Sequence, residues 1–147
     1  MPQIAEPINI FSGAPTELGA ALTNPTELSR QKGTLKRSYP VFFKGKRYPD
    51  AETAYQLLKA QSTSPEDLMA EILVAKFEQH KDLADAVAER GGIEWLKCCT
   101  HFTGARTDGA QAWEGAGLES RYIRVLVEGY ARFVQGDRTE MGQVSLF

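Results

Sequence analysis

The residues whose types and spacing could do chemistry lie on one predicted helix. Glu52, Gln56 and Lys59 stand at i, i+4 and i+7, so a helix that begins after Asp50 places them on one polar stripe. A carboxylate at the mouth of a cleft, with an amide and an amine beside it, can stabilise positive charge or activate water. From spacing alone, the simpler interpretation is that Glu52 is a solvated first-turn acid, whose charge the helix dipole favours.

A segment far along the chain holds a second group of candidates. Residues 103–117 are rich in Gly, Thr and Asp, which predicts a loop, and Trp113 and Glu114 lie inside it. Glycines around them would let the backbone approach a ligand closely. The alternative is that Trp113 fills a hole in the core. Arg121 then begins a predicted helix, where the dipole disfavours a cation, so we expect it to do something other than stabilise that helix.

A hairpin and a helix over residues 41–61 must position Glu52. The segment 41–43 is apolar and β-prone, and Gly45 permits a tight turn before a second short strand. Pro49 keeps the preceding residue extended, and Asp50 is a good N-cap. The helix then has an apolar stripe that would face the core, made of Ala51, Ala54, Tyr55 and Leu58.

The rest of the chain predicts further helices over residues 64–77, 81–90 and 120–134. Pro65 suits a first helical turn, Gly91 suits a helix end, and Ser120 can cap the last helix, whose apolar spacing makes it the central core helix. Strands are predicted over 8–11 and 93–102, although Trp95 and Leu96 could instead extend a turn. Residues 16–22 are either a short helix or irregular. Residues 26–38 are locally basic, which indicates a solvated loop or, alternatively, a rim that faces phosphate.

Length and composition indicate a single compact α+β domain, predominantly helical, with a small sheet. The chain has 147 residues, of which 42% are hydrophobic and 24% charged. A net charge of −2 argues against wholesale coating of nucleic acid, but not against a local basic rim. Two adjacent cysteines give no disulfide framework, and no signal peptide or membrane span is visible, so we expect a cytoplasmic protein. We expect the domain over residues 1–136 and a flexible tail over 137–147.

Several kinds of site are absent from the sequence. It has no Walker phosphate loop and no dinucleotide-binding glycine pattern after a strand. His80, His101, Cys98 and Cys99 lack the spacing of a zinc site, so we expect neither a metal nor a cofactor. Cys98 with His101 could form a nucleophile and base, but no third group is placed to orient them.

A series of short motifs runs through residues 8–134. They are Phe11–Ser12, Leu22–Pro25, Phe42, Gly45, Tyr48–Pro49, Glu52, Gln56, Lys59, Lys76–Phe77, Trp113, Gly115–Gly117 and Arg121. The order of these motifs resembles the NADAR superfamily, which includes the YbiA-like proteins. Thr53, Glu114 and Ser120 stand where the family pattern has His, Gly and Asn, and the segment between Gln61 and Leu68 is shorter.

The resemblance implies a compact α+β or mostly helical fold and an N-glycosidase activity. The substrate would be an ADP-ribosylated guanine in nucleic acid, or a ribosylamino-pyrimidine phosphate of riboflavin synthesis. Cleavage of an N-glycosidic bond passes through an oxocarbenium-like state that a carboxylate stabilises; Glu52 would have this role, with Glu114 as the second candidate. Trp113 would stack on a ring, and Arg121 with Lys59 would hold phosphates. The substrate-binding residues would be Asn24, Gln56, Lys59, Trp113 and Arg121.

The last five residues carry a separate motif. The sequence Gln143-Val144-Ser145-Leu146-Phe147 resembles the bacterial sliding-clamp-binding peptide. In such a peptide Leu146 and Phe147 would enter an apolar pocket, while Gln143 would form hydrogen bonds. The alternative is a frayed tail without a partner.

Three hypotheses about function follow. The first is an N-glycosidase that acts on an ADP-ribosylated base in DNA and that the tail recruits to the clamp. The second is a NADAR-like nucleotide-binding or clamp-interacting module that has lost catalysis. The third is an N-glycosidase of nucleotide or flavin metabolism, for which a clamp-binding peptide would have no use.

Overall fold

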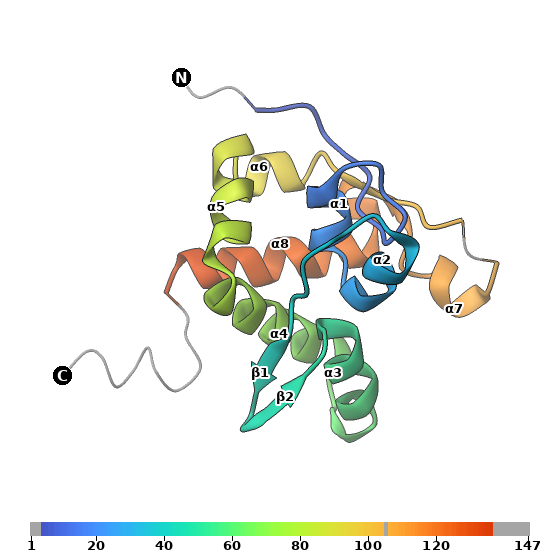
Figure 1. Cartoon of the computed structure of the whole chain (residues 1–147), viewed down its shortest axis with the longest axis vertical. Coiled ribbons are helices and arrows are strands. Elements are labelled where there is room, and N and C mark those ends of the chain that lie inside the picture. Colours follow the sequence, from blue (N-terminus) through green and yellow to red (C-terminus); the bar gives the residue numbers. More distant parts are fainter. Residues whose placement is uncertain (1–3, 105, 137–147) are drawn as a thin grey trace.

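The computed structural model describes residues 4–104 and 106–136. Helices make up most of this part, and two small antiparallel sheets complete it (Figure 1), so the predicted helix-rich α+β class is confirmed. The elements are α1 (Glu17–Leu22), α2 (Thr26–Lys32), β1 (Val41–Phe43), β2 (Lys46–Tyr48), α3 (Ala51–Leu58), η1 (Lys59–Gln61), α4 (Pro65–Gln79), α5 (Lys81–Arg90), α6 (Ile93–Leu96), β3 (Thr100–His101), α7 (Asp108–Gln111), β4 (Gly115–Ala116), η2 (Gly117–Glu119) and α8 (Arg121–Val134).

The core lies where α8 crosses α4, at the centre of Figure 1. The two helices approach closely because Gly129 has no side chain. A Cβ atom at Gly129 would lie only 2.8 Å from the Cβ of Leu73. The predicted core helix over residues 120–134 is therefore confirmed. Fully buried side chains at this crossing include Ile72, Leu73, Phe77, Ile123 and Leu126.

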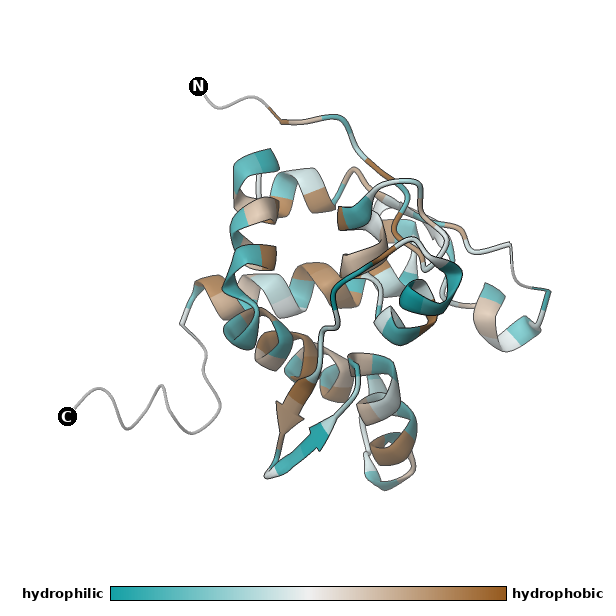
Figure 2. Cartoon of the chain, in the orientation of Figure 1, coloured by the Kyte–Doolittle hydropathy of each residue, from teal (hydrophilic) through white to brown (hydrophobic). Residues whose placement is uncertain are grey.

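The hairpin before α3 forms as the sequence predicts. Strands β1 and β2 pair antiparallel, with Val41 opposite Tyr48 and Phe43 opposite Lys46. Figure 2 shows an apolar β1 beside a polar β2. The open edge of β1 is covered by Gln79, whose side-chain amide donates to the Phe42 carbonyl and accepts from its N–H, both at 2.7 Å. This pairing satisfies the backbone that an edge strand would otherwise expose.

Two predicted strands are largely wrong. Residues 8–11 form only a single bridge, between Asn9 and Thr100. Residues 93–102 begin with one helical turn, α6, before the two-residue strand β3. Gly92, at a φ of 65°, reverses the chain before this turn, and the buried Trp95 donates its indole N–H to the Glu6 carbonyl at 2.9 Å. A buried apolar run therefore became helical because of its entry turn and a distant backbone partner.

Two predicted loops contain regular structure. Residues 26–32 form α2, which ends at Gly33 with a φ of 81°, so the solvated-loop interpretation of residues 26–38 is wrong for this half. The segment 103–117 contains the short helix α7 and the strand β4, which pairs with β3. Residues 17–22 are helical, and Thr16 caps this helix. These elements bring segments distant in sequence around one cavity.

Candidate active-site pocket

A pocket of about 810 Å³ opens between α2, α3, α7 and the N-terminal half of α8. This volume lies within the ordinary range for small-molecule sites. Three groups line it: polar side chains, aromatic rings and the backbone of the segment before α7. The lining consists of Ser12, Thr23, Asn24, Pro25, Leu28, Lys32, Glu52, Tyr55, Gln56, Lys59, Met69, His101, Thr103, Gly104, Gly109, Ala110, Trp113 and Tyr122.

Glu52 lines this pocket from the first turn of α3. Its backbone N–H donates to the Asn24 carbonyl at 3.2 Å, and its carboxylate accepts from the Gln56 amide at 2.6 Å. The carboxylate also acts on a ring across the pocket: burial raises the pKa of the Tyr122 hydroxyl, and the negative charge of Glu52 raises it further. Glu52 is therefore half-buried and directed into the cavity, which the solvated interpretation did not predict.

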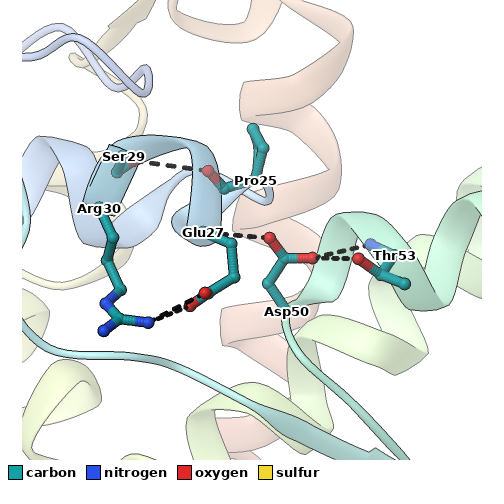
Figure 3. Close-up of polar contacts among 6 residues, drawn as sticks. All are labelled: Pro25, Glu27, Ser29, Arg30, Asp50 and Thr53. Carbon is teal, nitrogen blue, oxygen red and sulfur yellow. Dashed lines mark hydrogen bonds and ion pairs between the residues drawn. The ribbon is translucent and has the colours of Figure 1, made fainter. Parts of the chain in front are cut away.

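Asp50 fixes the start of the helix that carries Glu52. One carboxylate oxygen accepts from the Thr53 N–H at 2.9 Å and from its hydroxyl at 2.7 Å, as the predicted N-cap requires. The other oxygen accepts from the Glu27 N–H at 3.0 Å, in the first turn of α2. Figure 3 shows this carboxylate between the two helices. One buried side chain thus caps α2 and α3 together and sets the angle between two walls of the pocket.

Lys76 supports the same corner from below. It is 1% exposed, and its ammonium donates to the Ala21 carbonyl at 2.7 Å and the Thr23 carbonyl at 2.8 Å. Burial lowers the pKa of Lys76 to about 7, and the charge of Asp50 opposes this fall. These bonds hold the end of α1 directly before Asn24. The burial of this lysine was not predicted, because its partners are carbonyl groups more than fifty positions earlier in the chain.

The floor of the pocket is a cluster of buried polar groups. The Tyr122 hydroxyl donates to the Leu22 carbonyl at 2.6 Å and lies 3.1 Å from the side-chain oxygen of Asn24. The ring of His101 packs on Tyr122, with centroids 4.9 Å apart. The sequence predicted no role for Tyr122, and for His101 only that of a base beside Cys98. His101 lies in β3 and Tyr122 in α8, and the pairing of β4 with β3 brings these two elements together at the pocket.

Trp113 forms the opposite wall. Its indole stands edge-on to Tyr55, with centroids 6.1 Å apart, and the Arg121 guanidinium lies 4.0 Å from the centre of an indole ring. Arg121 is also ion-paired to Glu66, with Nε 2.5 Å from Oε2. The backbone carbonyl of Trp113 accepts from the Ser120 hydroxyl at 2.7 Å. Arg121 therefore does not line the pocket; it braces the aromatic ring that does.

Glu114 is not among the residues that line the pocket, but its carboxylate is hydrogen-bonded to Thr103, which is. Its carboxylate accepts from the Thr103 N–H at 2.8 Å and from the Thr103 hydroxyl at 2.5 Å. Both bonds lower the pKa of Glu114, and the bond from the hydroxyl has the larger effect. The bonds close the segment between residues 103 and 114 into a loop. This geometry gives Glu114 a structural use in this loop, beside its predicted catalytic one.

Two lysines bring positive charge to the pocket. Lys59, which was predicted, lies in η1 with its ammonium 5.7 Å from the centre of the Tyr55 ring. Lys32, which was not singled out, lies in the last turn of α2 and donates to the Ser12 hydroxyl at 2.7 Å. Lys32 belongs to the basic segment 26–38, so the alternative of a phosphate-facing rim was the signal that could have found it.

The structure thus brings five predicted residues into one lining: Asn24, Glu52, Gln56, Lys59 and Trp113. It places two beside the lining, Glu114 and Arg121. The predicted clamp-binding residues Gln143, Leu146 and Phe147 lie outside the described residues. Among residues 4–104 and 106–136, no group of three potential ligands could hold a metal ion. No helix in that same part of the chain has the length and apolar character needed to cross a bilayer.

Comparisons of the chain with protein-family models, with curated proteins and with solved structures gave no match. The proposals below therefore depend on the geometry of the pocket and on the motif resemblance.

Proposed function

We propose that this chain is an N-glycosidase that hydrolyses the bond between an ADP-ribosyl group and the base that carries it, with guanine in DNA as the expected target. The observation that carries the proposal is the pocket itself. The Glu52 carboxylate, the Trp113 ring and two lysine ammonium groups all open onto one cavity of about 810 Å³. An acid, a stacking surface and two cations are the groups that an ADP-ribosyl ligand requires.

The proposed reaction uses Glu52 as its one catalytic carboxylate. As the bond from the anomeric carbon to the base nitrogen breaks, its electron pair leaves with the base and positive charge develops on the sugar. The Glu52 carboxylate stabilises this charge and accepts a proton from the attacking water, which adds its oxygen to the anomeric carbon. The proton is then passed to the departing base. Gln56, at 2.6 Å from the carboxylate, holds Glu52 in place for both steps.

The remaining lining groups bind the ligand. Trp113 stacks on a ring of the substrate, and Arg121 keeps the indole in position from its far side. Lys32 and Lys59 pair with the two phosphates of the ADP-ribosyl group, whose charge they match. The resemblance to the NADAR superfamily enters this proposal through the motif residues on and after α3, which are Glu52, Gln56 and Lys59.

A second candidate function is a nucleotide-binding module without catalysis. The observation in its favour is that Glu52 is the one carboxylate among the described lining residues. Many glycosidases use two carboxylates, one of them as an acid on the leaving group. A pocket with one acid could hold an ADP-ribosyl ligand without cleaving it.

One experiment separates these candidates. ADP-ribosylated duplex DNA is incubated with the protein, and free ADP-ribose is measured by chromatography, while binding of ADP-ribose alone is measured by calorimetry. Release supports the glycosidase, and binding without release supports the module. A ribosylamino-pyrimidine phosphate, tested in parallel, reports the small-molecule alternative. If the protein neither cleaves nor binds any of these compounds, both assignments are overturned.

The clamp-binding peptide gives the proposal a partner. If residues 143–147 dock on the bacterial sliding clamp, the enzyme is brought to DNA that is being copied or repaired. Deletion of these five residues is expected to abolish capture of the chain by the immobilised clamp and to leave the melting temperature unchanged. Capture of the shortened chain at the wild-type level would contradict this.

A further inference from the structure

His101 differs from the other histidine of the chain in one respect. Both rings are buried, and burial lowers the pKa of each, so both are neutral at pH 7. In His80 both nitrogens have neighbours: Nε2 is 2.7 Å from the Pro40 carbonyl and Nδ1 is 3.4 Å from Arg37. In His101 only Nδ1 has a hydrogen-bond partner among the described residues, the Ile10 carbonyl at 2.6 Å.

The partner of Nδ1 decides where the proton of His101 lies. A carbonyl oxygen can only accept, so Nδ1 carries the hydrogen and Nε2 presents a lone pair. Among the described residues, Thr26 Oγ1 is the one buried side-chain polar atom that lacks a partner and is sealed from solvent. The Nε2 atom is therefore not sealed. His101 is 8% exposed and lines the pocket, so we infer that this lone pair is open to the cavity.

The neighbours of His101 make one end of the pocket rich in acceptors. Tyr122, against the imidazole ring, uses its own proton on the Leu22 carbonyl, which leaves its oxygen lone pairs. Glu52 contributes a carboxylate across the cavity. The cations Lys32 and Lys59 enter the pocket from α2 and η1. A ligand that suits this lining has neutral donors beside His101 and negative charge beside the lysines.

We propose that His101 Nε2 is a specificity-determining acceptor that takes a hydrogen bond from an O–H or N–H group of the ligand. This deepens the proposed function and rests on it, because the ligand is the ADP-ribosyl group, whose ribose hydroxyls and adenine amine are such donors. A buried acceptor left without its donor is costly, so the pocket rejects analogues in which that donor is missing.

The test uses two substitutions that keep different nitrogens. In His101→Asn the side-chain amide replaces Nδ1–H toward Ile10, but nothing replaces Nε2. In His101→Gln the longer side chain places its amide oxygen near the former Nε2. We expect ADP-ribose to bind about 10-fold more weakly to His101→Asn and within about 3-fold of wild type to His101→Gln. His80→Asn, the matched control, is expected to bind ADP-ribose as wild type does, and urea denaturation checks the folding of each variant.

Analogues locate the donor. ADP-ribose that lacks one hydroxyl of the distal ribose, or in which hydrogen replaces the adenine amine, is titrated into wild type and His101→Asn. The analogue without the contacted donor loses affinity for wild type but not for His101→Asn. Equal binding of ADP-ribose by wild type and a folded His101→Asn overturns the assignment, as does an equal loss for every analogue in both proteins.

A measurement without ligand separates this inference from the proposed function. Long-range ¹H–¹⁵N spectra of the ring, assigned with His80→Asn, are expected to show a neutral His101 with its proton on Nδ1. A proton on Nε2 overturns the inference whatever the ligand is. Wild-type protein that shows the expected tautomer but binds no ADP-ribose overturns the proposed function, and with it the ligand named for His101.

Discussion

The wall of the pocket that carries Glu52 is held by buried groups, whereas the indole ring of Trp113 on the opposite wall is braced by an ion pair at the surface. Asp50 and Lys76 are 3% and 1% exposed, and most of their hydrogen bonds end on backbone atoms. On the other wall, the ion pair that braces Trp113 joins Arg121 and Glu66, whose side chains are 34% and 49% exposed. Substitutions in the first wall should therefore cost stability, and those in the second should change ligand binding.

This difference matches the proposed roles of the two walls. A carboxylate that stabilises a transition state must be fixed before the reaction, because its benefit depends on geometry. A ring that stacks on a ligand tolerates small movements, since favourable ring pairs occur over a range of centroid distances, about 4.5–7 Å. The buried corner around Asp50 suits the first task, and the segment 103–117 suits the second.

Loss of Asp50 should have the largest effect on the free energy of unfolding. Asp50→Ala removes the cap of two helices, and each lost cap costs about 1 kcal/mol with more for burial, so we expect a loss of about 2–4 kcal/mol in the free energy of unfolding. Asp50→Asn keeps one acceptor oxygen and should fall between. Asp108→Ala, which removes an exposed first-turn acid on the other wall, should cost less than about 0.5 kcal/mol. Urea denaturation measures all three, and equal losses for Asp50→Ala and Asp108→Ala would contradict the account.

Lys76 should make stability rise with pH above neutrality. Between its folded pKa of about 7 and its ordinary value of 10.5, the unfolded chain holds a proton that the folded chain has released. Raising the pH therefore destabilises the unfolded state, and the free energy of unfolding should increase by about 1.5 kcal/mol from pH 7 to pH 8.5. Burial lowers the pKa of both histidines from 6.5 and raises the pKa of the Cys99 thiol from 9.0. These groups therefore titrate mainly outside the window between pH 7 and pH 8.5.

Lys76→Met tests this origin, because it should flatten the stability profile between pH 7 and pH 8.5. Lys81→Met, at the exposed first residue of α5, should keep the rise. Urea denaturation at several pH values gives both profiles. A rise that persists in Lys76→Met would show that another group causes it.

Arg121 should affect the ligand more than the fold. Arg121→Ala removes an exposed ion pair, so its cost in stability should stay below about 1 kcal/mol. It also removes the guanidinium from the Trp113 ring, and we expect the Kd for ADP-ribose to rise about 3-fold to 10-fold. Calorimetry measures the Kd, and Arg121→Lys, which keeps the charge without the planar group, should fall between. Unchanged affinity would mean that Trp113 needs no brace.

Glu114 should have the smallest effect. In Glu114→Gln the amide oxygen can still accept from Thr103, so the loop stays closed and the rate of ADP-ribose release should stay within about 3-fold of wild type. If Glu114 were the second catalytic carboxylate, the rate would fall by about 100-fold or more. A single-turnover assay on ADP-ribosylated DNA distinguishes these outcomes.

The elements around Glu52 were predictable because their signals are local. Asp50 caps α3 from three residues before its partner, and the hairpin turn lies at Lys44 and Gly45, which both have a positive φ. The second role of Asp50 was not predictable, since Glu27 lies 23 positions away and α2 has Pro25 in place of a capping side chain. Helix α2 was therefore assigned as a loop.

Long-range partners explain what was missed in the pocket. Nothing next to Lys76 in the sequence indicates that it reaches carbonyl groups 53 and 55 positions earlier. Tyr122 and His101 meet only because β4 pairs with β3 and leads into α8. Arg121 was recognised as unusual from its place in the helix dipole, but its partners, Trp113 and Glu66, were not.

The most direct test of the proposed function is the reaction of Glu52→Gln. We expect single-turnover release of ADP-ribose from ADP-ribosylated DNA to slow by about 100-fold to 10,000-fold, while the Kd for ADP-ribose stays within about 3-fold of wild type. Glu27→Gln, at a half-buried acid of α2 outside the pocket lining, should react at the wild-type rate. Release by Glu52→Gln at the wild-type rate would contradict the assignment of Glu52 as the catalytic carboxylate.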